Sequence, residues 1–218
     1  GKKRIDYVQE MTDYFTDLEL EYDFYKQLDG HKIKIDGSWH QYKIISSFRE
    51  IEESRENGIN TIYVIFTIEG AHVFNGGLGM MGKTADPADV LANVDKVKRW
   101  DKPLFFMGVT HHFYNEMVGH AQSLSGIVSK FCDQTEGLDT GIQELGWKVI
   151  RRLLDNTNGR RVLIDLKHMS VQSRNDYYRF LETEYPAEII PLLVSHGAVT
   201  GLRSYNEKVE DDLFNYGK

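Results

Sequence analysis

Four short polar segments carry the side chains best suited to hold a metal ion. Each offers a carboxylate or an imidazole directly after an apolar run: Glu69-Gly70, Thr110-His111-His112, Lys167-His168 and Ser195-His196-Gly197. Imidazole nitrogen and carboxylate oxygen are the usual protein ligands of zinc and similar divalent ions. Such an ion polarises a carbonyl group and lowers the pKa of a water molecule, so these segments indicate metal-assisted hydrolysis.

The apolar runs that precede these segments predict buried strands. They are rich in β-branched, aliphatic and aromatic residues and cover residues 61–68, 104–109, 161–166 and 189–194. A continuous apolar run of this length is typical of a parallel strand that is covered on both faces. Pro191 departs from the pattern, because proline cannot donate a backbone hydrogen bond within a sheet.

Helical patterns alternate with these strands at residues 85–100, 145–155 and 170–184. This alternation predicts right-handed βαβ units and a parallel sheet, hence an α/β fold. Because parallel strands all end at one edge of the sheet, the polar segments that follow them converge there. We therefore expect Glu69, His168 and His196 to form a metal site, with His111 beside them.

The region before the first of these strands has a different organisation. Residues 1–30 follow a helical pattern, and residues 31–44 alternate around Asp36-Gly37, which predicts a β-hairpin. We expect a single α/β domain over residues 1–218, with its βα units in residues 61–203.

The site candidates and the remaining histidines also have purely structural explanations. A histidine after a strand is more often a hydrogen-bonded structural residue than a ligand. Glu69 could be an ordinary loop carboxylate or the partner of a helix N-terminus. His112 and His120 are expected to be loop residues, whereas His31 and His40 flank the hairpin and are expected at the surface. His72 is close enough to Glu69 in sequence to line the site.

A glycine-rich segment at residues 77–82 (GLGMMG) matches the pattern G-x-G-x-x-G. A dinucleotide-binding fingerprint must follow directly on a strand and open a helix. This segment begins eight residues after Glu69, and the next helical pattern starts only near Ala85. It is therefore interpreted as a loop at the edge of the site, and a nucleotide-binding domain is a remote alternative.

The composition sets wider limits. The 218 residues carry a net charge of −7, which argues against a nucleic-acid partner. Cys132 is the only cysteine, so an intrachain disulfide and a cysteine-rich zinc site are excluded. No apolar run is long enough to span a membrane, and we expect a soluble protein, with the cytoplasm favoured.

The same segments resemble a known family in their order and spacing. The motifs IEG (68–70), VTH (109–111), IDLKH (164–168) and VSHG (194–197) are similar to those of the membrane dipeptidase family. That family is also called renal-dipeptidase-like or peptidase family M19, and it belongs to the amidohydrolase-like TIM barrels. The resemblance covers about residues 44–203.

The resemblance implies a role for each residue. Glu69 would bridge two zinc ions, and His168 and His196 would be zinc ligands on the fifth and sixth strands. His111 would contact the substrate and the tetrahedral intermediate. Arg203 would hold the substrate carboxylate, although its offset from His196 does not match the family well.

The sequence also departs from that family. It has no His-x-Asp pair of the kind that the family carries on its first strand, and Asp211 and Asp212 come too early to be its late catalytic aspartate. Lys167 stands where the family has a small hydroxyl residue, and Gly197 where it has serine. A (β/α)₈ barrel takes about 250 residues, so we expect an incomplete barrel that holds strands three to six.

The sequence leaves two functions open. The first is a metal-dependent hydrolase that cleaves a dipeptide or a related amide, with zinc as cofactor and a small molecule or dipeptide as substrate. The second is a chain with the architecture of such an enzyme that is catalytically incompetent by itself. An open half-barrel would also expose strand edges, which favours a homo-oligomer.

Overall fold

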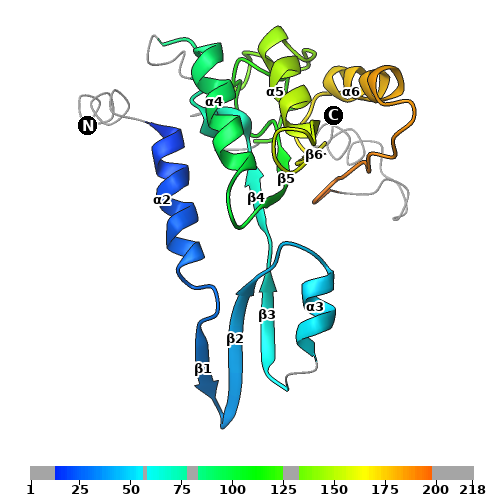
Figure 1. Cartoon of the computed structure of the whole chain (residues 1–218). Helices are drawn as coiled ribbons and strands as arrows, with labels where there is room; N and C mark the ends of the chain where they lie inside the picture. The colour runs from blue at the N-terminus through cyan, green and yellow to red at the C-terminus, as the bar shows by residue number, and fades with distance from the viewer. Residues whose placement is uncertain (1–12, 56–57, 78–82, 125–132, 198–218) are drawn as a thin grey trace, which may run out of the picture.

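The computed structural model describes residues 13–55, 58–77, 83–124 and 133–197. It is a mixed α/β structure with two three-stranded sheets, which lie end to end because strand β3 leads directly into strand β4 (Figure 1). The expected α/β class is confirmed, and the described residues form no closed barrel.

The first sheet contains the predicted hairpin. Its strands, in the order β1-β2-β3, are β1 (Lys32–Ile35), β2 (Ser38–Ile44) and β3 (Asn60–Val64). Strands β1 and β2 are antiparallel, and their turn has positive φ at Asp36 (48°) and Gly37 (83°), as a type I′ turn requires. Strand β3 pairs in parallel with β2 after a crossover through helix α3 (Arg49–Ser54).

The second sheet is parallel throughout, as predicted. Its strands, in the order β4-β5-β6, are β4 (Phe66–Glu69), β5 (Leu104–Gly108) and β6 (Leu163–Asp165). Helix α4 (Pro87–Lys98) joins the first two strands, helix α5 (Glu144–Leu154) joins the next two, and helix α6 (Val171–Glu184) follows β6. The chain therefore brings the ends of all three strands to one edge, as βαβ units do.

Local signals in the sequence fix where these helices begin. The Asp86 carboxylate accepts a hydrogen bond from the Ala88 backbone N–H at 2.8 Å, and Pro87 occupies the first turn of α4. The Ser170 hydroxyl accepts one from the Ser173 N–H at 2.9 Å at the start of α6. The second of these caps begins its helix two residues after His168.

The core lies on one face of the second sheet. Strand register places Ile68, Met107 and Ile164 side by side, and all three are buried in one cluster with side chains from α4, α5 and α6. Full burial of such a side chain contributes about 1.5–3 kcal/mol. The opposite face carries Thr67, which is exposed, and Phe106, which is half-buried. One face of this sheet is therefore packed and the other is open.

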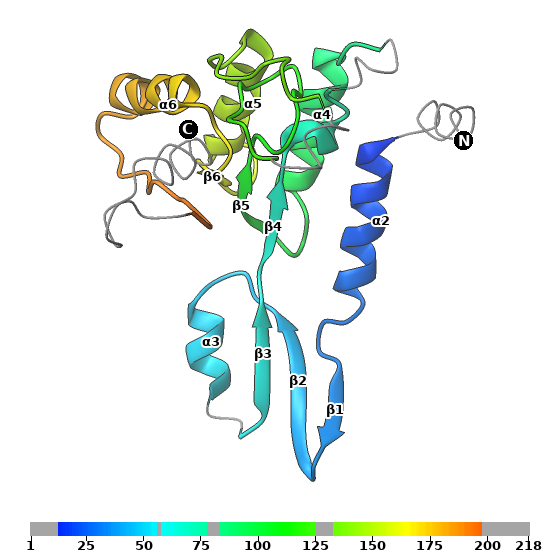
Figure 2. The same ribbon diagram turned by 180° about the vertical axis from the view of Figure 1, so that it is seen from behind.

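Helix α2 (Tyr14–Lys26) lies alongside the β4 edge of this sheet, while α6 lies on the far side (Figures 1 and 2). Its Tyr22 ring stacks on Trp100 with centroids 3.9 Å apart, and the Tyr22 hydroxyl donates to Asp101 at 2.7 Å. The helix predicted for residues 1–30 is confirmed over this range, and residues 1–12 lie outside the described part of the chain.

Two predicted strands are wrong. Residues 61–68 form parts of two strands in different sheets, and Ile62 and Ile65 are exposed rather than buried. Residues 189–194 make only an isolated bridge, between Leu193 and Asp165, and Ile189 is 97% exposed. Pro191 contributes to this second difference, since it cannot donate to a sheet.

Replacing Gly146 in α5 with alanine should destabilise the protein, although this substitution usually stabilises a helix. Replacing a helical glycine with alanine normally stabilises a helix by about 1 kcal/mol. A Cβ at Gly146 would overlap the carbonyl oxygen of Met117, which is a rigid backbone atom. We therefore expect Gly146→Ala to lower the free energy of unfolding by about 1–3 kcal/mol in urea denaturation. Unchanged or increased stability would contradict this packing.

Candidate metal centre

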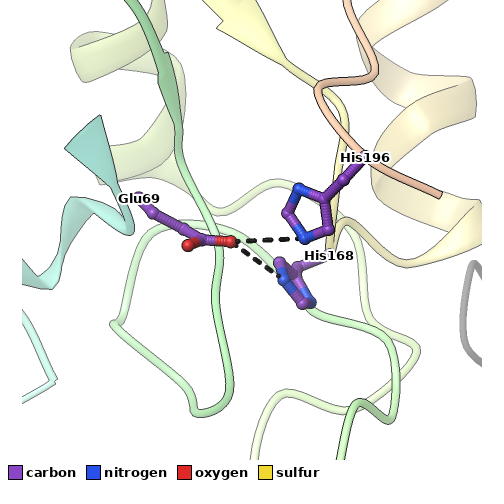
Figure 3. Close-up of side chains that lie close together, drawn as sticks. All are labelled: Glu69, His168 and His196. Atoms are coloured by element: carbon purple, nitrogen blue, oxygen red, sulfur yellow. Dashed lines mark hydrogen bonds and ion pairs between the residues drawn. The ribbon is translucent and has the colours of Figure 1, made fainter. Parts of the chain in front are cut away.

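Three of the predicted site residues come together in space. Glu69 is the last residue of β4, His168 follows β6, and His196 follows the bridge at Leu193, and their side chains converge (Figure 3). The Nε2 atom of His168 lies 3.1 Å from Oε1 of Glu69, and Nε2 of His196 lies 3.6 Å from the same oxygen. We call these three residues the triad.

The triad has the donors and the spacing that a divalent ion needs. Bonds of about 2.0–2.2 Å in a tetrahedral zinc site place neighbouring donor atoms about 3.3 Å apart. The two distances to Glu69 lie on either side of this value, and donor atoms of all three residues lie within 4.8 Å of one another. In the part of the chain that the structure describes, this is the single group with such an arrangement. One carboxylate and two imidazoles also form a suitable ligand set for zinc.

The backbone at His168 is held in an unusual conformation. Its φ is 65°, in the left-handed region that residues other than glycine rarely adopt. The Ala121 N–H donates to the His168 carbonyl at 2.8 Å and helps to hold it there. The His168 Nδ1 atom is buried and has no hydrogen-bond partner among the described residues. Strain and an unpaired buried atom both cost stability, which fits a residue kept for its chemistry.

His111 lies beside the triad but does not complete it. Its Nε2 atom is 3.6 Å from Oε1 of Glu69, and its ring centroid is 4.9 Å from that of His168. It is not part of the group whose donor atoms all lie within 4.8 Å of one another. His111 therefore lies next to the triad, as expected, without being one of its three donors.

The surroundings of His168 and His111 favour the neutral forms of these two rings. Burial, with further contributions from the charges of His111 and Lys167, lowers the pKa of His168 to about 4. Burial also lowers the pKa of His111, and the neighbouring His112 adds to the effect. Neutral imidazole is the form that binds metal ions, so the lowered pKa of His168 suits it to be a ligand at neutral pH.

Asp165 positions two members of the triad, and sequence reasoning missed it. This carboxylate is 4% exposed, and its Oδ1 atom accepts hydrogen bonds from the Lys167 N–H at 3.1 Å and the Ser195 N–H at 3.0 Å. It thereby links the segments that carry His168 and His196. One feature of the sequence could have indicated its role. Asp165 is an acidic residue within an apolar run, and a buried strand gives no reason for a carboxylate there.

His72 and His120 both have structural contacts outside the triad. His72 is packed between Tyr14 and Phe113, with ring centroids 5.3 and 5.1 Å away, and lies against Gly70. His120 is buried, and its ring nitrogens face the backbone oxygens of Ala121 and Glu136, so it fastens the loop to itself.

The remaining candidates do not contribute to the triad. His31 and His40 belong to the hairpin region of the first sheet, where His31 is exposed and His40 is half-buried. Arg203 lies outside the described residues, so its predicted role stays a prediction.

The glycine-rich segment does not have the context of a dinucleotide-binding loop. A short 3₁₀ helix, η2 (Ala71–Phe74), separates it from β4, and α4 starts only at Pro87. Gly77 donates its N–H to the Glu116 carboxylate at 3.2 Å, and residues 78–82 lie outside the described part. The strand–glycine–helix order that binds a pyrophosphate is therefore interrupted.

The lowered histidine pKa values predict how the metal-free protein responds to acid. Burial lowers the pKa of His72 to about 4, as it does for His168, from an ordinary value of 6.5. Between these values the unfolded chain binds more protons than the folded one, so acid favours unfolding. Each unit of lowering corresponds to about 1.4 kcal/mol. We expect the full stability above pH 6.5 and a progressive loss toward pH 4.

Urea denaturation in the presence of a chelator, at several pH values between 7 and 4, measures this loss. The matched variant is His72→Phe, which keeps an aromatic ring between Tyr14 and Phe113 and removes one titrating group. Its stability should depend less steeply on pH. An equally steep dependence in this variant would show that His72 is not the cause.

Comparisons with known proteins leave the chain without an assigned family. No family model matches it, and no curated protein matches it. None of the helices in the described residues is long and apolar enough to cross a membrane. The geometry of the triad therefore carries the functional argument.

Proposed function

We propose that this chain is a metal-dependent hydrolase that cleaves a dipeptide or a related amide bond with a metal-activated water. The observation that carries the proposal is the convergence of the His168 and His196 Nε2 atoms on one oxygen of Glu69, at 3.1 and 3.6 Å. These residues come from three separate segments and meet at the strand ends. Enzymes with parallel sheets place their active sites there.

We further propose membership of the membrane dipeptidase group and an incomplete (β/α) barrel, in which β4, β5 and β6 correspond to strands three to five and the parallel bridge at Leu193 marks the place of the sixth. The parallel order β4-β5-β6 with intervening helices supports this interpretation. The open face of this sheet, with Thr67 exposed, is also what a barrel wall without its remaining strands would present. Zinc is the proposed metal, with two ions in a complete site.

The proposed roles follow from the positions of the side chains. Glu69, His168 and His196 would hold the metal, and Glu69 has a second carboxylate oxygen with which to bridge to another ion. A divalent ion in such a site lowers the pKa of a water molecule and polarises a carbonyl group. His111 would orient the scissile carbonyl through a hydrogen bond from its ring. Asp165 would keep the two histidine ligands in register through the Lys167 and Ser195 backbones.

A second candidate is a metal-binding chain without catalytic competence. The triad supplies only three ligands within the described residues, and the Glu69 and His196 side chains are 48% and 54% exposed. A site that is open to water stabilises developing charge less effectively than an enclosed one. Zinc binding without hydrolysis would favour this candidate.

Metal reconstitution separates the two candidates. The chelated protein should release no amino acids from dipeptides, and added zinc should restore the release. Glu69→Gln keeps the shape of the side chain but removes its charge, so it should lower zinc-dependent hydrolysis at least about 100-fold. Hydrolysis that persists in chelator, or that Glu69→Gln leaves unchanged, would contradict the proposed function.

A further inference from the structure

A chain of hydrogen bonds links Gln134 and Ser123 to the ring of His112. The chain begins at Gln134, whose Oε1 accepts from the Leu124 backbone N–H at 2.9 Å. This bond sets the orientation of the amide, so the Gln134 Nε2 group is a donor on its other side. It donates to the Ser123 hydroxyl oxygen at 3.0 Å and to the His112 backbone carbonyl.

Ser123 lies between Gln134 and the imidazole of His112. Its hydroxyl oxygen accepts from Gln134, and it lies 2.8 Å from Nδ1 of His112. A hydroxyl group has one hydrogen, and among the described residues His112 Nδ1 is the one group at hydrogen-bond distance from Ser123 that could accept it. If Ser123 donates this hydrogen to Nδ1, a neutral His112 carries its proton on Nε2.

His112 lies close enough to the triad for this proton to matter. Its ring centroid is 3.6 Å from that of His111 and 5.4 Å from that of His168. Its Nε2 atom is on the side of the ring away from Ser123, and no described residue has a recorded bond to it.

We propose that His112 is a catalytic residue that donates an Nε2–H hydrogen bond to the substrate oxygen on which negative charge develops, and that Ser123 and Gln134 are positioning residues that set its tautomer. The inference rests on the proposed function. His111 and His112 would then face the scissile group as two adjacent imidazoles. The proton stays on His112 throughout, because the residue acts as a hydrogen-bond donor and not as an acid. A substrate with a carbonyl oxygen, such as a peptide or another amide, suits this arrangement.

The tautomer can be observed without any activity. Two-bond ¹H–¹⁵N spectra of protein labelled with ¹⁵N-histidine locate the proton, and the His112→Gln variant assigns the signal. We expect Nε2–H in the wild type. Gln134→Glu should invert the tautomer to Nδ1–H, because a carboxylate only accepts and Ser123 would then donate to it. Gln143→Glu is the matched control, since Gln143 donates to the Gly141 carbonyl and not to Ser123 or His112.

Two spectroscopic results would contradict the proposal that Gln134 and Ser123 set the tautomer of His112. Nδ1–H in the wild-type protein would do so, and so would a tautomer that Gln134→Glu leaves unchanged. Ser123→Ala offers a second route, because it should leave His112 as a mixture of tautomers while the Gln143→Glu control keeps Nε2–H.

Kinetics of the zinc-loaded protein test the catalytic role. Gln134→Glu should lower kcat roughly 100-fold, as loss of one oxyanion donor does, with KM and zinc affinity little changed. An unchanged kcat, or loss of zinc from this variant, would overturn the inference alone. Absence of dipeptide hydrolysis by the zinc-loaded wild type would instead overturn the proposed function, and this role of His112 with it.

Discussion

His168→Ala should lower the affinity for zinc by more than 100-fold. Loss of an outer-shell partner of a metal ligand costs roughly 10- to 100-fold, and loss of a ligand itself costs more. His168 supplies the donor closest to Glu69, at 3.1 Å, and its lowered pKa keeps it ready to bind. Competition of the protein with a chromophoric chelator at pH 7 measures the affinity directly. His196→Ala should have an effect of the same kind.

Two controls make this result specific. His31→Ala removes an exposed histidine of the hairpin region and should leave zinc affinity unchanged. His168→Asn introduces a residue that tolerates the left-handed conformation at φ 65°, so the metal-free protein should keep its stability while it loses zinc. If the His168→Ala variant bound zinc with wild-type affinity, the triad would not be the zinc site.

Asp165→Ala should weaken both the fold and the metal site. The substitution leaves the Lys167 and Ser195 backbone N–H groups without their carboxylate acceptor. An unsatisfied buried donor costs about 1–3 kcal/mol, so the free energy of unfolding should fall by about 2–5 kcal/mol. Because Asp165 aligns the segments of His168 and His196, zinc affinity should also fall roughly 10- to 100-fold. Urea denaturation and zinc titration measure the two effects separately.

Asp165→Asn is the matched control for this prediction. Its side-chain oxygen can still accept from both backbone groups, so it should lose much less stability than Asp165→Ala. If Asp165→Ala keeps wild-type stability and zinc affinity, then Asp165 does not position the histidines. If both variants lose zinc equally while the fold stays intact, the charge of Asp165 rather than its geometry is what matters.

Much of the second sheet could be predicted from residue patterns. Strand β5 and helices α4, α5 and α6 lie within a residue or two of their expected bounds, because their apolar periodicity and caps are local signals. The hairpin was also predictable, since Asp36-Gly37 suits the turn that it forms. In both cases the information lies within a few neighbouring residues.

The break between β3 and β4 could not be predicted in the same way. Residues 61–68 form one unbroken apolar run, and nothing local shows that β3 pairs with β2 while β4 pairs with β5. Pairing partners are a property of the tertiary structure. The same reason explains residues 189–194, where an apolar composition predicted a strand but only Leu193 forms a bridge.

The candidate site shows a similar division. Glu69, His168 and His196 could be predicted because each follows a strand and parallel strands end at one edge. Asp165 stands out in the sequence as an acidic residue within an apolar run, but its hydrogen bonds could not be predicted. The contacts from Gln134 through Ser123 to His112 could not be predicted either, because both sets depend on how loops fold against one another. His112 was expected to be an ordinary loop residue, and its place beside His111 and His168 gives it a proposed role.

Glu69, His168 and His196 are proposed to bind one metal ion together. Anomalous diffraction from zinc-soaked crystals, recorded on both sides of the zinc absorption edge, tests this proposal most directly. We expect an anomalous peak within about 2.0–2.2 Å of a Glu69 carboxylate oxygen and of one ring nitrogen each of His168 and His196. A peak held by other residues, or no peak at the triad at saturating zinc, would contradict it.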